Sequence, residues 1–127
     1  MSRIVVDVST VLTVLFAEKG SDAVAPRLAG ALLSAVNLAE IAMRCVDAGT
    51  KLEDALYQIG RLSLDFIPLD AGQANAAASL RPATRSLGLS LGDLACLGLG
   101  LSRQLPVLTA NREWRQLKIG VKVEVFR

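Results

Sequence analysis

Short apolar runs of β type alternate with longer runs of helical periodicity along nearly the whole chain. Such alternation is typical of an α/β fold with a mainly parallel sheet of about five strands, flanked by helices on both faces. A proline late in the third strand, Pro68, indicates that this strand lies near a sheet edge. The predicted strands are 3–7, 31–34, 65–69, 105–109 and 121–126, and the predicted helices are 10–17, 21–29, 35–47, 52–62, 71–87, 91–103 and 112–116.

The length of 127 residues suits one domain that can bury its own core, so we expect residues 1–127 to form a single unit. Hydrophobic residues make up 52% of the chain and aromatic residues 4%, which favours an aliphatic core and excludes a disordered chain. The net charge of +2 is too small to identify a nucleic-acid binder by itself. Any evidence for such a partner must come from where the arginines lie.

The chain contains no histidine and has two cysteines, Cys45 and Cys96, both within predicted helices. We expect both cysteines to be small buried residues in a reducing compartment. A zinc site of the His/Cys kind and a Ser-His-Asp or Cys-His nucleophile are therefore not expected. Hydrolysis by this chain would need carboxylates and a metal ion.

The amino terminus has some features of a signal peptide, because Arg3 precedes an apolar stretch that reaches Phe16. Asp7 interrupts that stretch, and no small-x-small cleavage site follows before Glu18. No segment approaches the ~20 apolar residues needed to span a bilayer. We therefore expect a cytoplasmic protein with no membrane association.

Three acids stand in apolar surroundings near predicted strand ends or helix starts: Asp7, Glu40 and Asp93. Asp7 closes the first strand, and ligands of open parallel sheets bind outside the carboxyl ends of the strands. Glu40 lies in the first turns of the helix after the second strand. Asp93 follows Gly92, which leaves room for a close approach.

The helix at 35–47 places Asn37, Glu40, Arg44 and Asp47 within about 80° of one another at 100° per residue. A solvated face would explain Arg44 and Asp47. It explains Glu40 less well, because the first turn after the strand already overlooks the crevice.

Two structural alternatives apply further along the chain. Ser90 and Asp93 have the spacing of a capping box, which would use the acid at a helix start. Thr109, Asn111 and Arg112 follow a strand and could offer oxygen ligands and a phosphate contact. An Asx turn that caps the short helix at 112–116 would explain Asn111 equally well.

Asp7, Glu40, Asp93 and Asn111 together come from four strand ends or adjacent helix starts. Hard oxygen ligands of this kind suit Mg²⁺ or Mn²⁺. A metal ion bound there supports hydrolysis of a phosphodiester. Without a cation, clustered acids repel one another and raise their own pKa values.

The pattern resembles a PIN domain, and most closely the VapC-type toxin ribonucleases of prokaryotic toxin–antitoxin pairs. The resemblance covers essentially the whole chain and is specific in the order and spacing of its parts rather than in any one of them. These parts are Val5-Val6-Asp7-Val8-Ser9 with Leu12 to Glu18, Ser34 with Asn37-Leu38-Ala39-Glu40, Leu89-Ser90-Leu91-Gly92-Asp93, and Leu105-Pro106-Val107-Leu108-Thr109-Ala110-Asn111-Arg112 with Trp114.

The resemblance implies a Mg²⁺- or Mn²⁺-dependent endoribonuclease with Asp7, Glu40 and Asp93 as metal ligands. It also implies a homodimer, a cognate antitoxin that blocks the site, and structured RNA such as tRNA or ribosomal RNA as the target. Family members often carry a fourth acid where this chain has Asn111, so a second metal ion would be held less well. Thr109 completes the expected catalytic set.

Because an anionic site needs cations to hold an RNA backbone, we expect Arg44, Arg112 and Arg115 to contact phosphates. The high apolar content also favours a two-fold homodimer and a hydrophobic channel for an antitoxin segment.

Two alternatives remain open at this point. One is a catalytically impaired PIN-like module that binds RNA or protein, which Asn111 supports. The other is a phosphoacceptor signalling domain, which would need a phosphorylatable acid after the central strand and a lysine after the last one. Asp70 follows a strand that contains a proline, and no lysine is placed to match.

Overall fold

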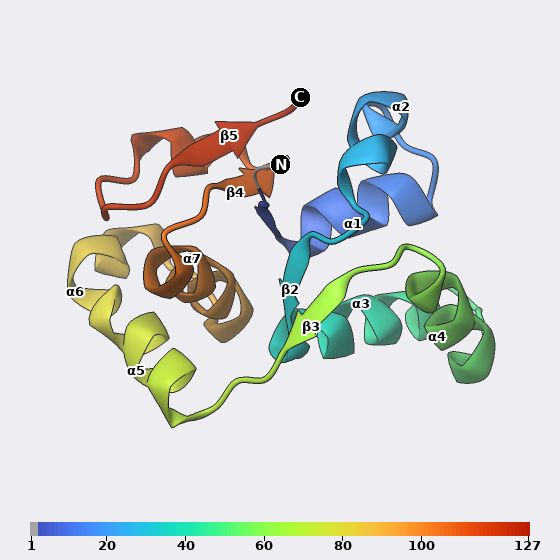
Figure 1. Cartoon of the computed structure of the whole chain (residues 1–127), viewed down its shortest axis with the longest axis horizontal. Coiled ribbons are helices and arrows are strands. Elements are labelled where there is room, and N and C mark those ends of the chain that lie inside the picture. The colour runs from blue at the N-terminus through green and yellow to red at the C-terminus, as the bar shows by residue number, and fades with distance from the viewer. Residues whose placement is uncertain (1–2) are drawn as a thin grey trace.

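The computed structural model describes residues 3–127, which form one five-stranded sheet with helices on both faces (Figure 1). All strands are parallel, in the order β3-β2-β1-β4-β5, which confirms the predicted α/β class. The strands are β1 (Val5–Val6), β2 (Leu32–Ser34), β3 (Asp65–Ile67), β4 (Val107–Thr109) and β5 (Val123–Val125).

The helices divide between the two faces of the sheet. In Figure 1, α5, α6 and α7 lie at the left, below β4 and β5, whereas α1, α3 and α4 lie at the right, with α3 partly behind β3. The α-helices are α1 (Val8–Leu15), α2 (Ser21–Val24), α3 (Ala35–Asp47), α4 (Leu52–Gly60), α5 (Ala71–Ser79), α6 (Arg81–Thr84) and α7 (Leu91–Arg103), and the 3-10 turns are η1 (Ala25–Arg27), η2 (Arg85–Leu87) and η3 (Arg112–Gln116).

Two apolar cores form because successive side chains of a strand point to opposite faces. Val6 packs in one core with residues of α1, α3 and α4, whereas Val5 packs in the other with residues of α5 and α7. The side chains of the neighbouring strands β2 and β4 divide in the same way. Leu33 and Leu108 lie in the same core as Val6. Leu32 and Val107 lie in the same core as Val5. Both cysteines are buried, as the sequence predicts.

Several predicted boundaries are wrong, and prolines account for two of them. The helix predicted at 71–87 ends at Ser79, and the chain re-forms as α6 and η2, because Pro82 has no backbone donor and fits only a first helical turn. The helix predicted at 21–29 divides in the same way into α2 and η1 at Pro26. Its first residue, Ser21, is as predicted.

The first strand is shorter than its predicted range of 3–7, and the first helix begins earlier than the predicted residue 10. Only Val5 and Val6 form the strand, and α1 begins at Val8. The cause is Asp7, whose side chain accepts a hydrogen bond from the backbone of Thr10 and so caps the helix. Strand and helix therefore follow each other with one residue between them.

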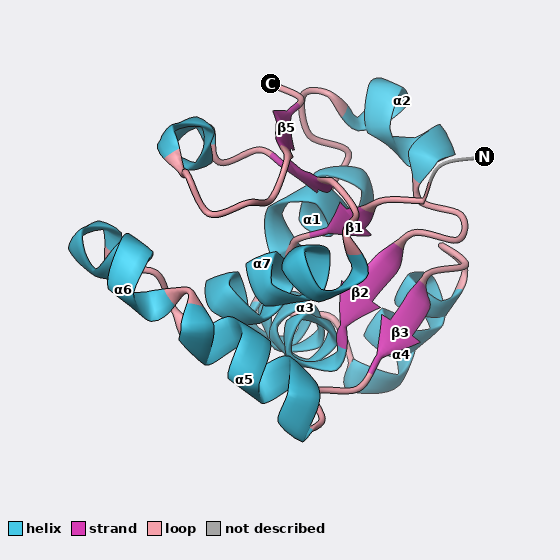
Figure 2. Cartoon of the chain, turned by 60° about the vertical axis from the view of Figure 1, so that its left-hand side comes forward, coloured by secondary structure: helices cyan, strands magenta, loops and turns pink. Residues whose placement is uncertain are grey.

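The strand order places β3 at one edge of the sheet, as Pro68 predicts, and β5 at the other (Figure 2). From β1 the chain passes to β2 on one side, and later returns to β4 on the other side. Ligand crevices of open parallel sheets form at such a reversal of strand order, outside the carboxyl ends of the strands. The fold thus predicts a site where β1 and β4 end. Within residues 3–127, no helix is long and apolar enough to cross a membrane.

A close contact between α5 and α7 provides a test of this packing. A Cβ atom added at Gly98 would lie 2.8 Å from the backbone nitrogen of Ala77. Gly98→Ala should therefore force the two helices apart, at a cost of roughly 1–3 kcal/mol that exceeds the helix-propensity gain of at most about 1 kcal/mol. We expect a lower midpoint in urea unfolding. An unchanged or higher midpoint would contradict this packing.

Candidate functional site

A pocket of about 430 Å³ opens where β1 and β4 end, at the reversal of strand order. All three acids singled out in the sequence line it, together with Asn111 and one of the three predicted arginines, Arg44. The full lining is Asp7, Val8, Ser9, Leu12, Phe16, Glu18, Asn37, Glu40, Arg44, Gly92, Asp93, Asn111 and Arg127.

Asp7 lines this pocket and is only 6% exposed. Its Oδ1 accepts hydrogen bonds from the backbone N–H of Thr10 at 2.9 Å and from the Thr10 hydroxyl at 2.8 Å. The hydroxyl of Ser9 donates at 2.7 Å, and that of Thr109 donates to Oδ2 at 2.6 Å. These bonds tie the end of β1, the start of α1 and the end of β4 to one carboxylate.

Burial raises the pKa of Asp7 above its ordinary value of 3.8, although the hydrogen bonds from Thr109, Ser9 and Thr10 act in the opposite direction. The ionised carboxylate is thus oriented by many donors but remains in an environment that disfavours its charge. A bound cation would compensate for that charge.

Glu40 reaches across from α3 to the first turn of α7. Its Oε1 accepts a hydrogen bond from Nδ2 of Asn37 at 2.9 Å, and the same amide group donates to the carbonyl of Gly92 at 3.1 Å. A Cβ atom at Gly92 would lie 2.0 Å from Oε1 of Glu40. Gly92 therefore provides the space that the Glu40 carboxylate occupies. The group that approaches this glycine closely is the side chain of Glu40.

Asp93 forms the capping box that the sequence offered as an alternative explanation. Its Oδ2 accepts from the backbone N–H of Ser90 at 3.0 Å, and the Ser90 hydroxyl accepts from the backbone N–H of Asp93 at 3.1 Å. Asp93 nevertheless lines the pocket with Asp7 and Glu40. One carboxylate thus serves the helix start and the pocket wall together.

The negative charges of all three acids affect the pKa of one buried thiol, that of Cys96. Burial raises the pKa of Cys96 well above its ordinary value, and the negative charges of Asp7, Asp93 and Glu40 raise it further, in that order. Within residues 3–127, however, no three side chains of ligand type are close enough together to hold one ion in these conformations. Glu40 is turned toward Asn37, and Asp93 toward Ser90. Chelation would require rotation of these side chains.

The oxygen chemistry of the pocket fits a divalent ion such as Mg²⁺ or Mn²⁺, because carboxylates dominate it and histidine and thiolate are absent from its lining. One further oxygen is available. Asn37 is 1% exposed, and its Oδ1 has no hydrogen-bond partner among the described residues, 3–127. An unpartnered buried oxygen is destabilising unless a ligand or water satisfies it. The sequence placed Asn37 on the polar stripe of α3 but did not mark it as a site residue.

Asn111 has the capping role that the sequence offered as an alternative: its Oδ1 accepts from the backbone N–H of Glu113 at 3.1 Å and caps η3. It also lines the pocket. Thr109 is buried beside it, and its hydroxyl accepts from the Asn111 backbone at 3.0 Å while donating to Asp7. Thr109 therefore acts on the pocket through Asp7.

The three arginines predicted from the sequence have different positions relative to the pocket. Arg44 lines the pocket, whereas Arg112 and Arg115 are not among its lining residues. The Nε of Arg112 instead donates to the backbone oxygen of Arg127 at 3.1 Å. Arg127 itself lines the pocket, although no motif marks it in the sequence.

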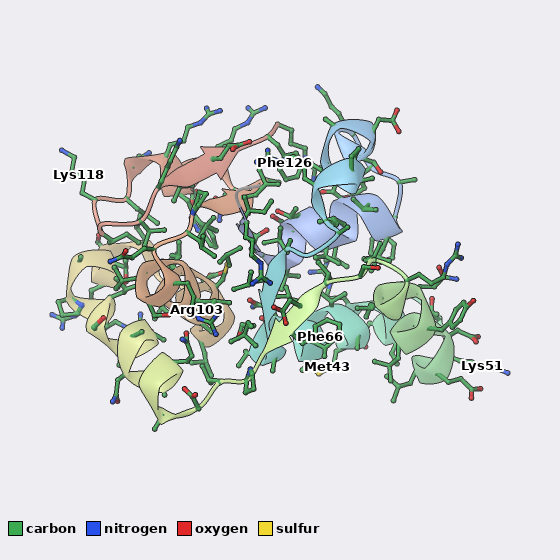
Figure 3. The ribbon with its side chains drawn as sticks, viewed as in Figure 1. Met43, Lys51, Phe66, Arg103, Lys118 and Phe126 are labelled. Carbon is green, nitrogen blue, oxygen red and sulfur yellow. The ribbon has the colours of Figure 1, made fainter. Side chains whose placement is uncertain are left out.

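The end of the chain is held against the loop between α1 and α2. Nη1 of Arg127 donates to the carbonyl of Lys19 at 2.8 Å, and Nη2 lies 3.4 Å from a carboxylate oxygen of Glu18. Figure 3 shows Phe126 beside this loop, where its ring would contact a Cβ atom at Gly20 at 3.1 Å. Sequence reasoning could not find this part of the pocket, because the two segments are far apart in the chain.

Comparison with known proteins gives one family. A family model described as PIN domain matches residues 4–120. No curated protein matches the chain.

Similar solved structures extend the comparison to the whole chain. A chain of a DNA-bound VapBC from Salmonella typhimurium is 20% identical, with a TM-score of 0.76 and full coverage of both chains (100% and 100%). A toxin–antitoxin complex from Klebsiella pneumoniae gives 14% identity and a TM-score of 0.75, covering 100% of this chain and 98% of that one. VapBC-5 from Mycobacterium tuberculosis is 24% identical, with a TM-score of 0.63, and the match covers 100% of this chain and 99% of that chain. At these identities the likeness shows a shared fold.

Proposed function

The chain belongs to the PIN domain family, and from this we propose that it is a metal-dependent endoribonuclease, the toxin of a toxin–antitoxin pair. The observation that carries the proposal is the pocket at the ends of β1 and β4. There Asp7, Glu40 and Asp93, from three separate elements, line one cavity together with two arginines. A structural role alone explains the Asp93 capping box but not the convergence of three acids.

In this proposal Asp7, Glu40 and Asp93 are the ligands of Mg²⁺ or Mn²⁺. Such an ion, when bound, lowers the pKa of a water molecule and stabilises the leaving oxygen of a phosphodiester. Ser9 and Thr109 orient Asp7 through their hydroxyls. Arg44 and Arg127 place positive charge at the same pocket, where an RNA phosphate would otherwise be repelled.

Protein partners form the second part of the proposal. Similar chains are found in toxin–antitoxin complexes, and this supports a cognate antitoxin here. Large apolar side chains are also exposed on α3 and α4, outside the pocket lining. They support contact with an antitoxin or with a second copy in a homodimer, and are Met43, Val46, Leu52, Leu56 and Tyr57. We propose structured RNA as substrate and the cytoplasm as location.

A catalytically impaired RNA- or protein-binding module remains the second candidate. It is favoured by Asn111, which supplies an amide where a fourth acid would strengthen metal binding, and whose oxygen is used to cap η3. Incubation of total RNA with the purified chain in Mn²⁺, and in excess chelator, separates the two functions. Cleavage that depends on Mn²⁺ supports the nuclease. RNA binding without cleavage in either condition supports the binding module.

Asn111→Asp tests whether this position faces the ion. A carboxylate there would add a negative charge to the pocket and could still cap η3, because Asp is as good a cap as Asn. We expect the Kd for Mn²⁺, measured by calorimetry, to fall, with RNA cleavage equal or faster. Weaker Mn²⁺ binding by the variant would show that Asn111 lies outside the coordination sphere.

A further inference from the structure

The side chain of Asn37 joins the two helices that carry Glu40 and Asp93. Helices α3 and α7 are in contact (Figure 2), and both contribute residues to the acidic pocket. The Nδ2 group of Asn37 donates one hydrogen bond to Oε1 of Glu40 at 2.9 Å and another to the carbonyl of Gly92 at 3.1 Å. Gly92 directly precedes Asp93. One amide group is thus bonded to one acid and to the backbone beside another.

The orientation of this amide group is determined by its neighbours. Both groups that face Nδ2 are oxygen acceptors, and an amide turned by half a rotation would place its own oxygen against them. Asn37 precedes Glu40 by three residues, so the two side chains lie on the same face of α3. A Cβ atom at Gly92 would lie 2.0 Å from Oε1 of Glu40. This oxygen is therefore confined between the Asn37 amide and the backbone of α7.

A purely structural role does not explain Asn37. Three buried side-chain atoms lack a hydrogen-bond partner within residues 3–127, and of these only Oδ1 of Asn37 belongs to a residue that lines the acidic pocket. A buried polar group with an unused acceptor costs free energy that an apolar side chain of the same shape would not cost. Leucine or alanine would also favour the helix more than asparagine does. The two bonds from Nδ2 account better for an asparagine at this position.

The bond to Asn37 limits the movements that Glu40 can make. It uses Oε1 of the carboxylate and leaves the other oxygen, Oε2, for a ligand. The rotation that chelation requires then becomes a turn about a fixed point, rather than a search through all conformers of a long side chain. A side chain that is restricted before binding loses less entropy when a ligand binds.

We propose that Asn37 is a positioning residue of the metal site, which holds Glu40 by Oε1 and thereby offers Oε2 to the ion. The inference rests on the proposed nuclease function and adds a residue outside the three proposed ligands. Asn37 acts through Glu40 and not on the reacting atoms. Partners that orient metal ligands in this way commonly change metal affinity by about 10- to 100-fold.

Calorimetric titration with Mn²⁺ tests this role in Asn37→Leu and Asn37→Ala. Leucine keeps the branched shape of asparagine without its hydrogen bonds. Asn75→Ala is the matched control, because Asn75 is an exposed asparagine of α5 outside the pocket lining. We expect the Kd for Mn²⁺ to rise by about tenfold or more in both Asn37 variants and to stay unchanged in Asn75→Ala. An unchanged or lower Kd in the Asn37 variants would overturn the inference.

Urea unfolding in excess chelator separates positioning from a structural role. Asn37→Leu removes a buried oxygen without a partner together with two hydrogen bonds, so we expect a midpoint close to that of the wild type. A lower midpoint with an unchanged Kd for Mn²⁺ would assign Asn37 to the support of the fold alone, which overturns the inference.

A double-mutant cycle with Glu40→Ala shows whether the effect passes through Glu40. That variant lacks the carboxylate that Asn37 holds, so adding Asn37→Leu to it should not raise the Kd for Mn²⁺ any further. The Mn²⁺ concentration is extended until both proteins saturate. A further rise as large as the one in the wild-type background would show that Asn37 acts on another group, and the inference would fall.

Failure of the inference is distinguishable from failure of the proposed function. Mn²⁺ binding by the wild type, without coupling between Asn37 and Glu40, overturns only the positioning role. Absence of Mn²⁺ binding by the wild type overturns the metal-dependent function, and the positioning role with it.

Discussion

Asp7→Asn should reduce RNA cleavage by more than about 100-fold, since even an outer partner of a metal ligand is commonly worth 10- to 100-fold, while the protein stays folded. The variant keeps an oxygen that can accept from the backbone of Thr10. Its new amide N–H can donate to the hydroxyl oxygen of Ser9 or Thr109, each of which now donates to the carboxylate. The lost quantity is the negative charge that would hold the ion.

The same substitution should leave the free energy of unfolding equal or higher at neutral pH. Burial raises the pKa of Asp7 in the folded protein, so the stability that this group contributes is fully present below its unfolded pKa of 3.8 and is lost as pH rises through the folded pKa. Asn is neutral throughout and does not undergo this loss. The advantage of the variant should therefore grow as pH rises above 3.8.

Urea unfolding at several pH values and cleavage of labelled RNA in Mn²⁺ check the two expectations. Asp47→Asn is the matched control, because Asp47 lies on the same polar stripe as Glu40 but outside the pocket lining, and it should change neither quantity. Near wild-type cleavage by Asp7→Asn would show that the metal assignment is wrong. A fall in stability would show that its hydrogen bonds outweigh its buried charge.

Gly92→Ala should produce the second large effect, a loss of cleavage of roughly 10- to 100-fold with little loss of stability. The added Cβ would lie 2.0 Å from Oε1 of Glu40, so the carboxylate must move. Its movement costs little for folding because it is the end of a flexible side chain, and Ala favours the helix by up to about 1 kcal/mol over Gly. The effect should thus appear in cleavage rather than in unfolding.

Two comparisons make this result specific. Gly98→Ala on the same helix meets the backbone of Ala77 and should lower stability while leaving cleavage per folded molecule unchanged. If Gly92→Ala acts through Glu40, adding it to Glu40→Gln should cause no further loss of cleavage. Full additivity of the two losses would show that the methyl group acts on something other than the Glu40 carboxylate.

The sequence identified those residues of the pocket that local chemistry marks. Asp7 interrupts an apolar run, Glu40 lies in the first turns after a strand, and Asp93 follows a glycine; the fold brings all three to one pocket. The parallel α/β fold followed from the alternation of strand and helix periods, and the edge position of β3 from Pro68. These inferences depend on residues close together in the chain.

The missed features depend on contacts between distant segments. Arg127 enters the pocket because β5 is parallel to β4 and ends at the same edge of the sheet, and no local pattern marks that residue. Arg112, which does follow a recognisable motif, is instead bonded to the backbone of Arg127. The double role of Asp93 could not be read from the sequence, because the capping box and the pocket lining involve the same residue.

Calorimetric titration with Mn²⁺ tests the central claim most directly, namely that Asp7, Glu40 and Asp93 together hold a divalent ion. The wild type and three single variants, Asp7→Asn, Glu40→Gln and Asp93→Asn, would be titrated beside Asp47→Asn. We expect Mn²⁺ binding by the wild type and by Asp47→Asn, with a loss of affinity of about tenfold or more in each of the other three. Equal affinity in all five proteins, or no binding by the wild type, would contradict the assignment of this pocket as a metal site.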